Sequence, residues 1–325
     1  MNTKNKPVKY GRFALISIIA LLVLGGSVFY LRPIMVLSWA TGIQLRLNGF
    51  ESKYVQTESY KMHYWVGGEG KPLILVHGAG ADGQSFLSIM PNLAKNYRVY
   101  AIDLPGFGDS DKPSEPDYST RFQAMQLYNF AKTLQIEKAY VLGLCMGGNV
   151  TLTFAHNWPE RVEKMILVNG PFIYDQKLYK LDFSFFDNPQ NIEEIRYFFD
   201  NSNVPEYPDF ILRDILRIFQ EQSWILQRVT GTIFTEAESW NRDKFSKLKM
   251  PVLLLWGKKD FAFPEEVGKR THRALPNSVF ISFAECKHLE AGDNCSNLIL
   301  PEVEKFLSGK SYPAGSTIEV PAPSQ

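Results

Sequence analysis

The residues Gly143-Leu144-Cys145-Met146-Gly147-Gly148 are the most informative segment of this 325-residue chain. It follows an apolar run typical of a buried strand, residues 139–142, and precedes a run of helical character, residues 149–156. A chain that passes from strand to helix within so few residues must turn sharply. Glycines two residues before and two residues after Cys145 leave room for such a turn, because they carry no Cβ. The sequence therefore predicts a strand–turn–helix unit with Cys145 at the apex of the turn.

A cysteine at such an apex is placed to act as a nucleophile. The helix that begins there points free backbone N–H groups at the reacting centre, and these favour a thiolate and the oxyanion formed after attack on a carbonyl. A buried structural cysteine in a glycine-rich turn is the alternative reading of this motif alone, because free cysteines are commonly buried.

Three further segments support the nucleophile. Residues 72–76 form an apolar run that ends in His77-Gly78-Ala79-Gly80, and residues 97–102 lead into Asp103 and a D-x-P-G-x-G-x-S pattern. Residues 250–256 form another apolar run, which ends in G-x-x-D at Asp260. A shorter strand run, residues 278–283, is followed by Cys286-Lys287-His288. A candidate nucleophile (Cys145), a candidate acid (Asp260) and a candidate base (His288) thus follow one another along the chain.

With these motifs in this order, the chain resembles the α/β-hydrolase superfamily from about Lys53 to Leu307. The resemblance implies an α/β fold with a mostly parallel central sheet flanked by helices. It also implies a catalytic triad in which Asp260 fixes the tautomer of His288, and His288 exchanges a proton with Cys145. Taken singly, Asp260 could be a turn former and His288 a surface histidine.

The same resemblance assigns the oxyanion hole to backbone N–H groups of Met146 and Ala79, with Gly80 as the next candidate. His77 could serve as the base, but its place before a glycine favours a structural role. Asp103 is also expected to be structural.

In finer detail, the pattern is similar to membrane-anchored monoacylglycerol lipases, except that cysteine replaces the nucleophilic serine. Polyhydroxyalkanoate synthases and dienelactone hydrolases carry cysteine at this position. The expected function is hydrolysis of carboxylic esters or thioesters with an apolar acyl group, or of lipids, through a thioester acyl-enzyme. The alternatives are an acyltransferase that uses the same acyl-enzyme and a non-enzymatic ligand receptor on a hydrolase scaffold.

The N-terminus carries the signature of a membrane anchor. Residues 13–31 contain no charged side chain and are long enough to span a bilayer as one helix. The preceding residues 1–12 are basic, through Lys4, Lys6, Lys9 and Arg12. This bias predicts a cytoplasmic N-terminus, a single-pass anchor and a catalytic body on the periplasmic or extracellular side. A cleaved signal peptide is the alternative, because Ser38-Trp39-Ala40 resembles a cleavage site.

The remaining segments divide by composition. Residues 32–52 are predicted to be juxtamembrane, and their apolar spacing fits either a helix on the lipid surface or a helix packed on the body. Residues 53–170 and 250–308 form the predicted core, and residues 171–249 a helical cap rich in aromatic side chains. Some of these aromatics are expected to line the cleft above Cys145. Residues 309–325 are rich in proline, serine and small residues and are predicted to be a disordered tail.

Composition excludes several classes of partner. A net charge of +1 without a basic stripe gives no case for nucleic acid. No C-x-x-C pair indicates a metal site and no G-x-G-x-x-G indicates a dinucleotide, so no cofactor is expected. Besides Cys145, the chain has Cys286 and Cys295. In an oxidising compartment these two are the candidate disulfide, whereas in a reducing one they would remain separate thiols.

Overall fold

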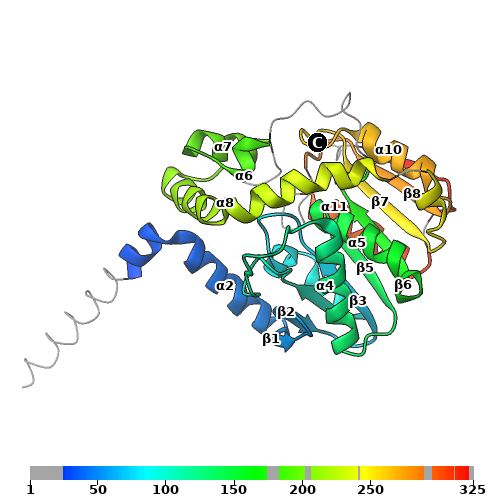
Figure 1. Ribbon diagram of the computed structural model, residues 1–325, viewed down its shortest axis with the longest axis horizontal. Coiled ribbons are helices and arrows are strands. Elements are labelled where there is room, and N and C mark those ends of the chain that lie inside the picture. The colour runs from blue at the N-terminus through cyan, green and yellow to red at the C-terminus, as the bar shows by residue number, and fades with distance from the viewer. Residues whose placement is uncertain are drawn as a thin grey trace, which may run out of the picture.

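The computed structural model describes residues 25–173, 183–201, 206–240, 242–288, 295–310 and 312–321. In this part of the chain, nine strands form one sheet (Figure 1): β1 (Glu51–Gln56), β2 (Lys61–Gly67), β3 (Lys71–Val76), β4 (Tyr97–Ile102), β5 (Ala139–Leu144), β6 (Val162–Val168), β7 (Val252–Gly257), β8 (Ser278–Phe283) and β9 (Thr317–Val320). Their order across the sheet is β1-β2-β4-β3-β5-β6-β7-β8-β9. β2 runs antiparallel to both neighbours, and every other pair is parallel. The predicted mostly parallel sheet is confirmed.

Helices cover both faces of the sheet: α2 (Pro33–Leu47), α3 (Met90–Leu93), α4 (Thr120–Thr133), α5 (Met146–Asn157), α10 (Glu265–Ala274) and α11 (Ser296–Leu307), with two short 3-10 helices, η1 (Gly83–Phe86) and η2 (Pro159–Arg161). In β3, Ile74 and Val76 belong to the core on the side of α4, α5 and α10. Leu73 and Leu75 belong to the core on the side of α2, α3 and α11. Because both faces are covered, the central parallel strands are apolar at nearly every position, as their sequences show.

The segment between β6 and β7, predicted to be the cap, has helices but no strand among its described residues: α6 (Ser184–Asp187), α7 (Ile192–Asp200), α8 (Asp209–Glu238) and α9 (Arg242–Ser246). The long helix α8 crosses above the body, with α6 and α7 against one part of it (Figure 1). Residues 174–182, 202–205 and 241 of the predicted cap lie outside the described residues.

The predicted tail requires a correction. Residues 317–320 form β9, which pairs in parallel with β8, so the prediction of disorder over 309–325 is wrong there. The run Thr317-Ile318-Glu319-Val320 contains three β-branched residues, and it pairs with the backbone edge that β8 would otherwise expose. A prediction from proline and serine content overlooks these β-branched residues.

Most of the predicted anchor, residues 13–24, lies outside the described residues. Within the described part, no single helix has the length and apolar character needed to cross a bilayer. The helices Gly25–Leu31 and Pro33–Leu47 satisfy the criterion only when taken together, and they meet with a bend of 109°. α2 contacts β1, η1 and α8, while many of its apolar side chains remain exposed.

Candidate active site

Cys145 lies between β5 and α5, in the turn that the sequence predicts. Its backbone has φ 52° and ψ −118°, in the left-handed region that non-glycine residues rarely adopt. The Cys145 N–H donates to the carbonyl oxygen of Val168 at 2.9 Å, which ties the turn to the end of β6. The tertiary structure therefore holds Cys145 in a strained conformation that exposes its side chain at the carboxyl end of the sheet.

The glycines of the motif are required by close backbone contacts. A Cβ on Gly143 would lie 2.3 Å from the carbonyl oxygen of Gly147. A Cβ on Gly147 would lie 2.1 Å from the carbonyl oxygen of Val76 in β3. Because these backbone carbonyl oxygens are fixed in a helix and in a strand and cannot move aside, both positions exclude a larger residue.

The structure brings Cys145, His288 and Asp260 together from three separate segments. The Nδ1 atom of His288 lies 2.8 Å from Oδ2 of Asp260, and both residues are buried. Burial by itself lowers the pKa of His288, but the charge and hydrogen bond of Asp260 and a hydrogen bond with Cys145 raise it well above the ordinary value. Because Nδ1 faces Asp260, Nε2 is the ring nitrogen available to Cys145. The arrangement can move a proton between the Cys145 sulfur and the His288 ring.

Asp260 is held by further hydrogen bonds that the sequence analysis did not anticipate. Its Oδ1 accepts from the backbone N–H groups of Ala262 at 2.8 Å and Phe263 at 2.9 Å. Its Oδ2 accepts from the side-chain amide of Asn169, whose Oδ1 in turn accepts from the N–H of Gly257 at 3.2 Å. The only sequence signal for this role is a polar residue directly after the apolar strand β6.

Ala79 and Met146, the residues assigned to the oxyanion hole, both line the pocket that contains Cys145. Met146 is the first residue of α5, where backbone N–H groups have no partner within the helix. A Cβ on Gly78 would lie 3.3 Å from the Cβ of Cys145, so the turn that carries Ala79 passes close to the nucleophile.

The side chains of His77 and Asp103 form hydrogen bonds with nearby backbone groups. In His77, Nδ1 lies 2.7 Å from the carbonyl oxygen of Gly78, and Nε2 accepts from the N–H of Leu104 at 3.0 Å. Burial lowers the pKa of His77, so the neutral ring fits this pair of backbone partners. Asp103 accepts from the N–H groups of Gly83 and Asp109 and contacts Nδ1 of His63 at 2.8 Å.

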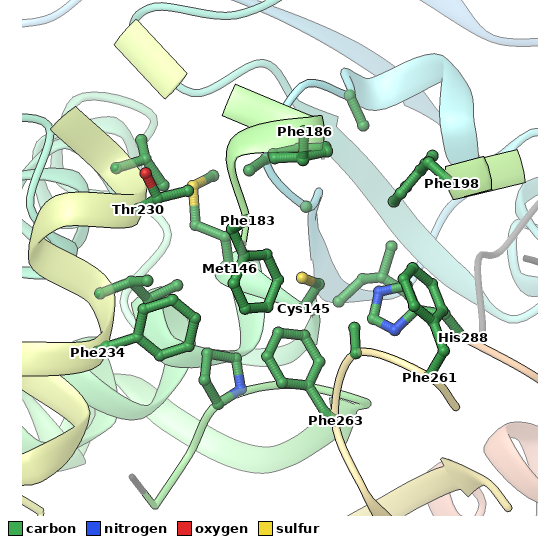
Figure 2. Close-up of a pocket in the computed structure, with 18 of the residues that line it drawn as sticks. Cys145, Met146, Phe183, Phe186, Phe198, Thr230, Phe234, Phe261, Phe263 and His288 are labelled. Atoms are coloured by element: carbon green, nitrogen blue, oxygen red, sulfur yellow. The ribbon is translucent and has the colours of Figure 1, made fainter. Parts of the chain in front are cut away.

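The pocket above Cys145 is almost entirely apolar. Figure 2 shows the Cys145 sulfur between Phe183 and Met146 on one side and His288 on the other, with Phe186 above and Phe263 below. Seven phenylalanines from the cap and the body line it: Phe183, Phe185, Phe186, Phe198, Phe234, Phe261 and Phe263. Among the described lining residues there is no lysine, arginine, aspartate or glutamate. The pocket therefore suits a neutral, apolar group.

Cys286 and Cys295 form a disulfide, which is the pairing that the sequence analysis offered for an oxidising compartment. The bridge closes a short loop that carries His288. Cys145 is a free cysteine. Within the described residues, no group of three or more His, Cys, Asp or Glu side chains is placed to hold a metal ion.

A protein-family model described as the alpha/beta hydrolase fold matches residues 71–194. The chain is 29% identical over 248 residues to YugF, an uncharacterized hydrolase of Bacillus subtilis, and the match covers 71% of this chain and 87% of that protein. It is 28% identical over 260 residues to a 2-hydroxy-6-oxononadienedioate/2-hydroxy-6-oxononatrienedioate hydrolase of Paraburkholderia phymatum, covering 73% and 89%.

Among solved structures, the chain is similar to the crystal structure of a membrane phospholipase A, with a TM-score of 0.74 and 24% identity. The match covers 92% of this chain and 99% of that one. This likeness concerns the fold.

Proposed function

We propose that this chain is a member of the α/β-hydrolase superfamily and that it hydrolyses carboxylic esters or thioesters with an apolar acyl group through an acyl-enzyme on Cys145. The observation that carries the proposal is the contact of His288 with both Asp260 and Cys145 at a pocket lined by phenylalanines. A hydrogen-bonded nucleophile, base and acid in a desolvated pocket is the arrangement that acyl transfer requires.

In the acylation step, the Cys145 sulfur attacks the substrate carbonyl carbon while His288 takes the thiol proton. The negative charge that develops on the carbonyl oxygen is stabilised by the N–H groups of Ala79 and Met146. His288 then gives the proton to the leaving alcohol or thiol as the carbon–oxygen or carbon–sulfur bond breaks. A thioester between the acyl group and Cys145 remains.

In the deacylation step, His288 accepts a proton from water, and the resulting hydroxide attacks the thioester carbonyl. The same N–H groups stabilise the second tetrahedral intermediate. Its collapse releases the free acid and returns the proton to the Cys145 sulfur. Asp260 stabilises the imidazolium form of His288 in both steps without itself taking the proton.

The described pocket lining has no lysine or arginine, and His288 is already paired with Asp260, so a neutral acyl group is favoured over a dicarboxylate. The relative from Paraburkholderia phymatum is named for a dienedioate, a molecule with two carboxylates. Burying a carboxylate among phenylalanines without a cationic partner costs several kcal/mol, on the order of the penalty for an unpaired buried ion. We therefore place the substrate among uncharged esters and lipids.

The proposal includes a membrane location. Residues 13–31 anchor the chain, and the catalytic body lies on the periplasmic or extracellular side. The basic residues before the apolar run support this orientation, and so does the disulfide, since disulfides persist in oxidising compartments. Protease added to intact spheroplasts should digest the body, and complete protection would contradict the orientation.

A panel of p-nitrophenyl esters and acyl thioesters of increasing chain length tests the reaction. Wild type should release free acid, and Cys145→Ala should lose this activity. In Cys145→Ala no acyl group should remain on the protein, whereas a trapped acyl-enzyme on wild-type Cys145 should appear by mass spectrometry. Full activity of Cys145→Ala, or transfer of the acyl group to an added amine with no free acid formed, would contradict the proposal.

A further inference from the structure

The exposed apolar side chains of this protein are concentrated in one short segment. Eight of the twelve large apolar side chains that are exposed in the described residues lie between positions 29 and 47: Phe29, Tyr30, Leu31, Met35, Leu37, Trp39, Ile43 and Leu47. The exposed fraction of Trp39 is 68% and that of Leu47 is 83%. A contiguous patch of this kind marks an interaction surface rather than scattered surface hydrophobics.

The spacing of these residues makes a continuous stripe along α2. Met35, Trp39, Ile43 and Leu47 recur every four residues and therefore share one face of the helix. The opposite side of α2 packs on the body, where Gly42 lies against Trp65, and Leu45 is fully buried. The stripe faces away from the protein core.

Several observations identify a lipid bilayer as the occupant of this face. The stripe follows directly on the apolar run of residues 13–31, so it begins where the proposed anchor ends. Residues 25–47 include no acidic side chain, and Arg32 and Arg46 are their only charged residues. Tyrosine and tryptophan, here Tyr30 and Trp39, are the aromatic residues enriched at the boundary between lipid and water.

A cleft beside the stripe adds positive charge. Tyr30 and Leu31 line it from the helix Gly25–Leu31, and Phe210, Arg213, Asp214 and Arg217 line it from α8. Arg217 forms a salt bridge with Asp214 at 2.7 Å, so the positive charge of the cleft comes from Arg213. Arg213 is exposed. A guanidinium next to an apolar surface fits the anionic headgroups of a bilayer.

The residues at the junction of the helix Gly25–Leu31 with α2 contact α8 of the cap. The backbone N–H of Ile34 donates to Oδ2 of Asp214 on α8 at 3.0 Å, and Nε of Arg32 lies 3.7 Å from Oδ1 of the same buried aspartate. Tyr30 stacks on Phe210 with 5.5 Å between ring centroids. Farther along α8, Val229, Thr230, Ile233 and Phe234 line the catalytic pocket. A membrane surface that binds α2 would therefore also lie next to α8, the helix that forms one wall of the catalytic pocket.

We propose that the α2 stripe, defined as Met35, Trp39, Ile43 and Leu47, lies in the interfacial layer of a bilayer that contains anionic lipid. This contact is additional to the anchor and keeps the cap beside the lipid from which an apolar substrate would enter. The inference rests on the membrane location given under the proposed function and is independent of the chemistry at Cys145.

Tryptophan fluorescence of the full chain in vesicles tests the stripe. The vesicles contain phosphatidylcholine and phosphatidylglycerol with brominated acyl chains, which quench only tryptophans in contact with lipid. Of the described tryptophans, only Trp39 and Trp224 are exposed. Wild type should be quenched, Trp39→Phe should lose most of the quenching, and the matched variant Trp224→Phe should keep it. Equal quenching in wild type and Trp39→Phe would overturn the proposal.

Flotation of the same samples separates this proposal from the anchor. If the protein floats with the vesicles but Trp39 is not quenched, the stripe proposal fails and the anchor stands. If the protein does not float, both membrane proposals fail, while the ester assay still reports on Cys145. If Trp39 is unquenched and Trp39→Glu abolishes a chemically cross-linked dimer, the stripe binds a second copy of the chain, which also overturns the proposal.

A functional readout uses Trp39→Glu, with Trp224→Glu as control. On an ester embedded in vesicles, Trp39→Glu should raise KM, whereas kcat/KM on a water-soluble short ester should stay as in wild type. An unchanged KM on the vesicle substrate would count against the stripe. Thermal unfolding by circular dichroism establishes that each variant is folded.

Discussion

Asn169 donates a hydrogen bond from its side-chain amide to Oδ2 of Asp260, the same oxygen that contacts Nδ1 of His288. Asn169 does not line the pocket, and it reaches the reaction only through Asp260. It is therefore a positioning residue. Its backbone, with φ 28°, turns the side chain back toward the end of β7.

Substitution of Asn169 should lower the rate without weakening substrate binding. In Asn169→Ala, Asp260 loses one of the hydrogen bonds that orient it, so we expect kcat to fall about tenfold, the effect of losing a hydrogen bond to a charged group. KM should change little, because the pocket lining is intact. Steady-state kinetics on the best ester of the panel measure both constants, with Asn129→Ala, a buried asparagine on α4, as control. A rise in KM with unchanged kcat would contradict a positioning role.

The pH dependence of the reaction should report on Asp260. The Asp260 carboxylate raises the pKa of His288, so His288 remains protonated to a higher pH than an isolated histidine. Asp260→Asn removes the negative charge, and the pKa of His288 should fall. In the proposed mechanism His288 acts as a base, so its deprotonation sets the acidic limb of the kcat/KM profile. We expect this limb to move to lower pH, with kcat reduced by roughly a thousandfold or more, as in other triads that lose this charge. An acidic limb at the wild-type pH would show that His288 is not the group that titrates.

The disulfide should stabilise the loop that carries His288. Cys286 and Cys295 are nine residues apart, and closing a loop of that size restricts the unfolded chain by about 2–3 kcal/mol. The double variant Cys286→Ala/Cys295→Ala should therefore lose roughly this free energy of unfolding in urea titrations, and kcat should also fall. Wild type treated with reductant serves as a second measurement. If the double variant unfolds at the wild-type urea concentration, the bridge contributes no stability.

Asp82 should make stability decline toward alkaline pH. Burial and the nearby charge of Asp103 raise the pKa of Asp82 to about 7. A group whose pKa is higher in the folded state stabilises it fully below the unfolded pKa of about 4, and that contribution is lost as pH rises through about 7. Asp82→Asn can still accept the hydrogen bond from the N–H of Gln84, which is 2.8 Å long in the wild type.

The free energy of unfolding of wild type should thus fall between pH 4 and pH 8 more steeply than that of Asp82→Asn. Urea titrations across this range measure the difference. Asp243→Asn, which changes an exposed aspartate on α9, should keep the wild-type slope. Parallel slopes for wild type and Asp82→Asn would contradict the raised pKa.

Features encoded by neighbouring residues could be predicted from the sequence. The turn at Cys145 is local, because an apolar strand, closely spaced glycines and a helical run leave one way to connect them. The continuous apolar runs of β3, β5 and β7 can also be recognised from neighbouring residues, because parallel strands covered by helices on both faces are apolar at nearly every position. The candidate triad followed from the order of motifs along the chain.

Other features depend on contacts between distant segments and carry little local signal. Asn169 is one polar residue after a strand, and only the packing of β6 beside β7 places it against Asp260. β9 lies in a segment of disordered composition and forms because β8 presents a free edge. The sequence could not tell whether residues 32–52 pack on the body or face outward. The fold gives α2 both a buried side and an exposed stripe.

The sequence alone was enough to predict the strand–turn–helix unit at Cys145 and the candidates for nucleophile, acid and base, because the steric demands at glycine and the order of motifs can be read from short segments. Only the tertiary structure decided which side chains surround that triad, how the cap's phenylalanines close over Cys145 and how α2 is joined to α8 through Asp214. Those relations depend on the packing of segments tens to hundreds of residues apart, and local sequence patterns do not specify how such segments fit together.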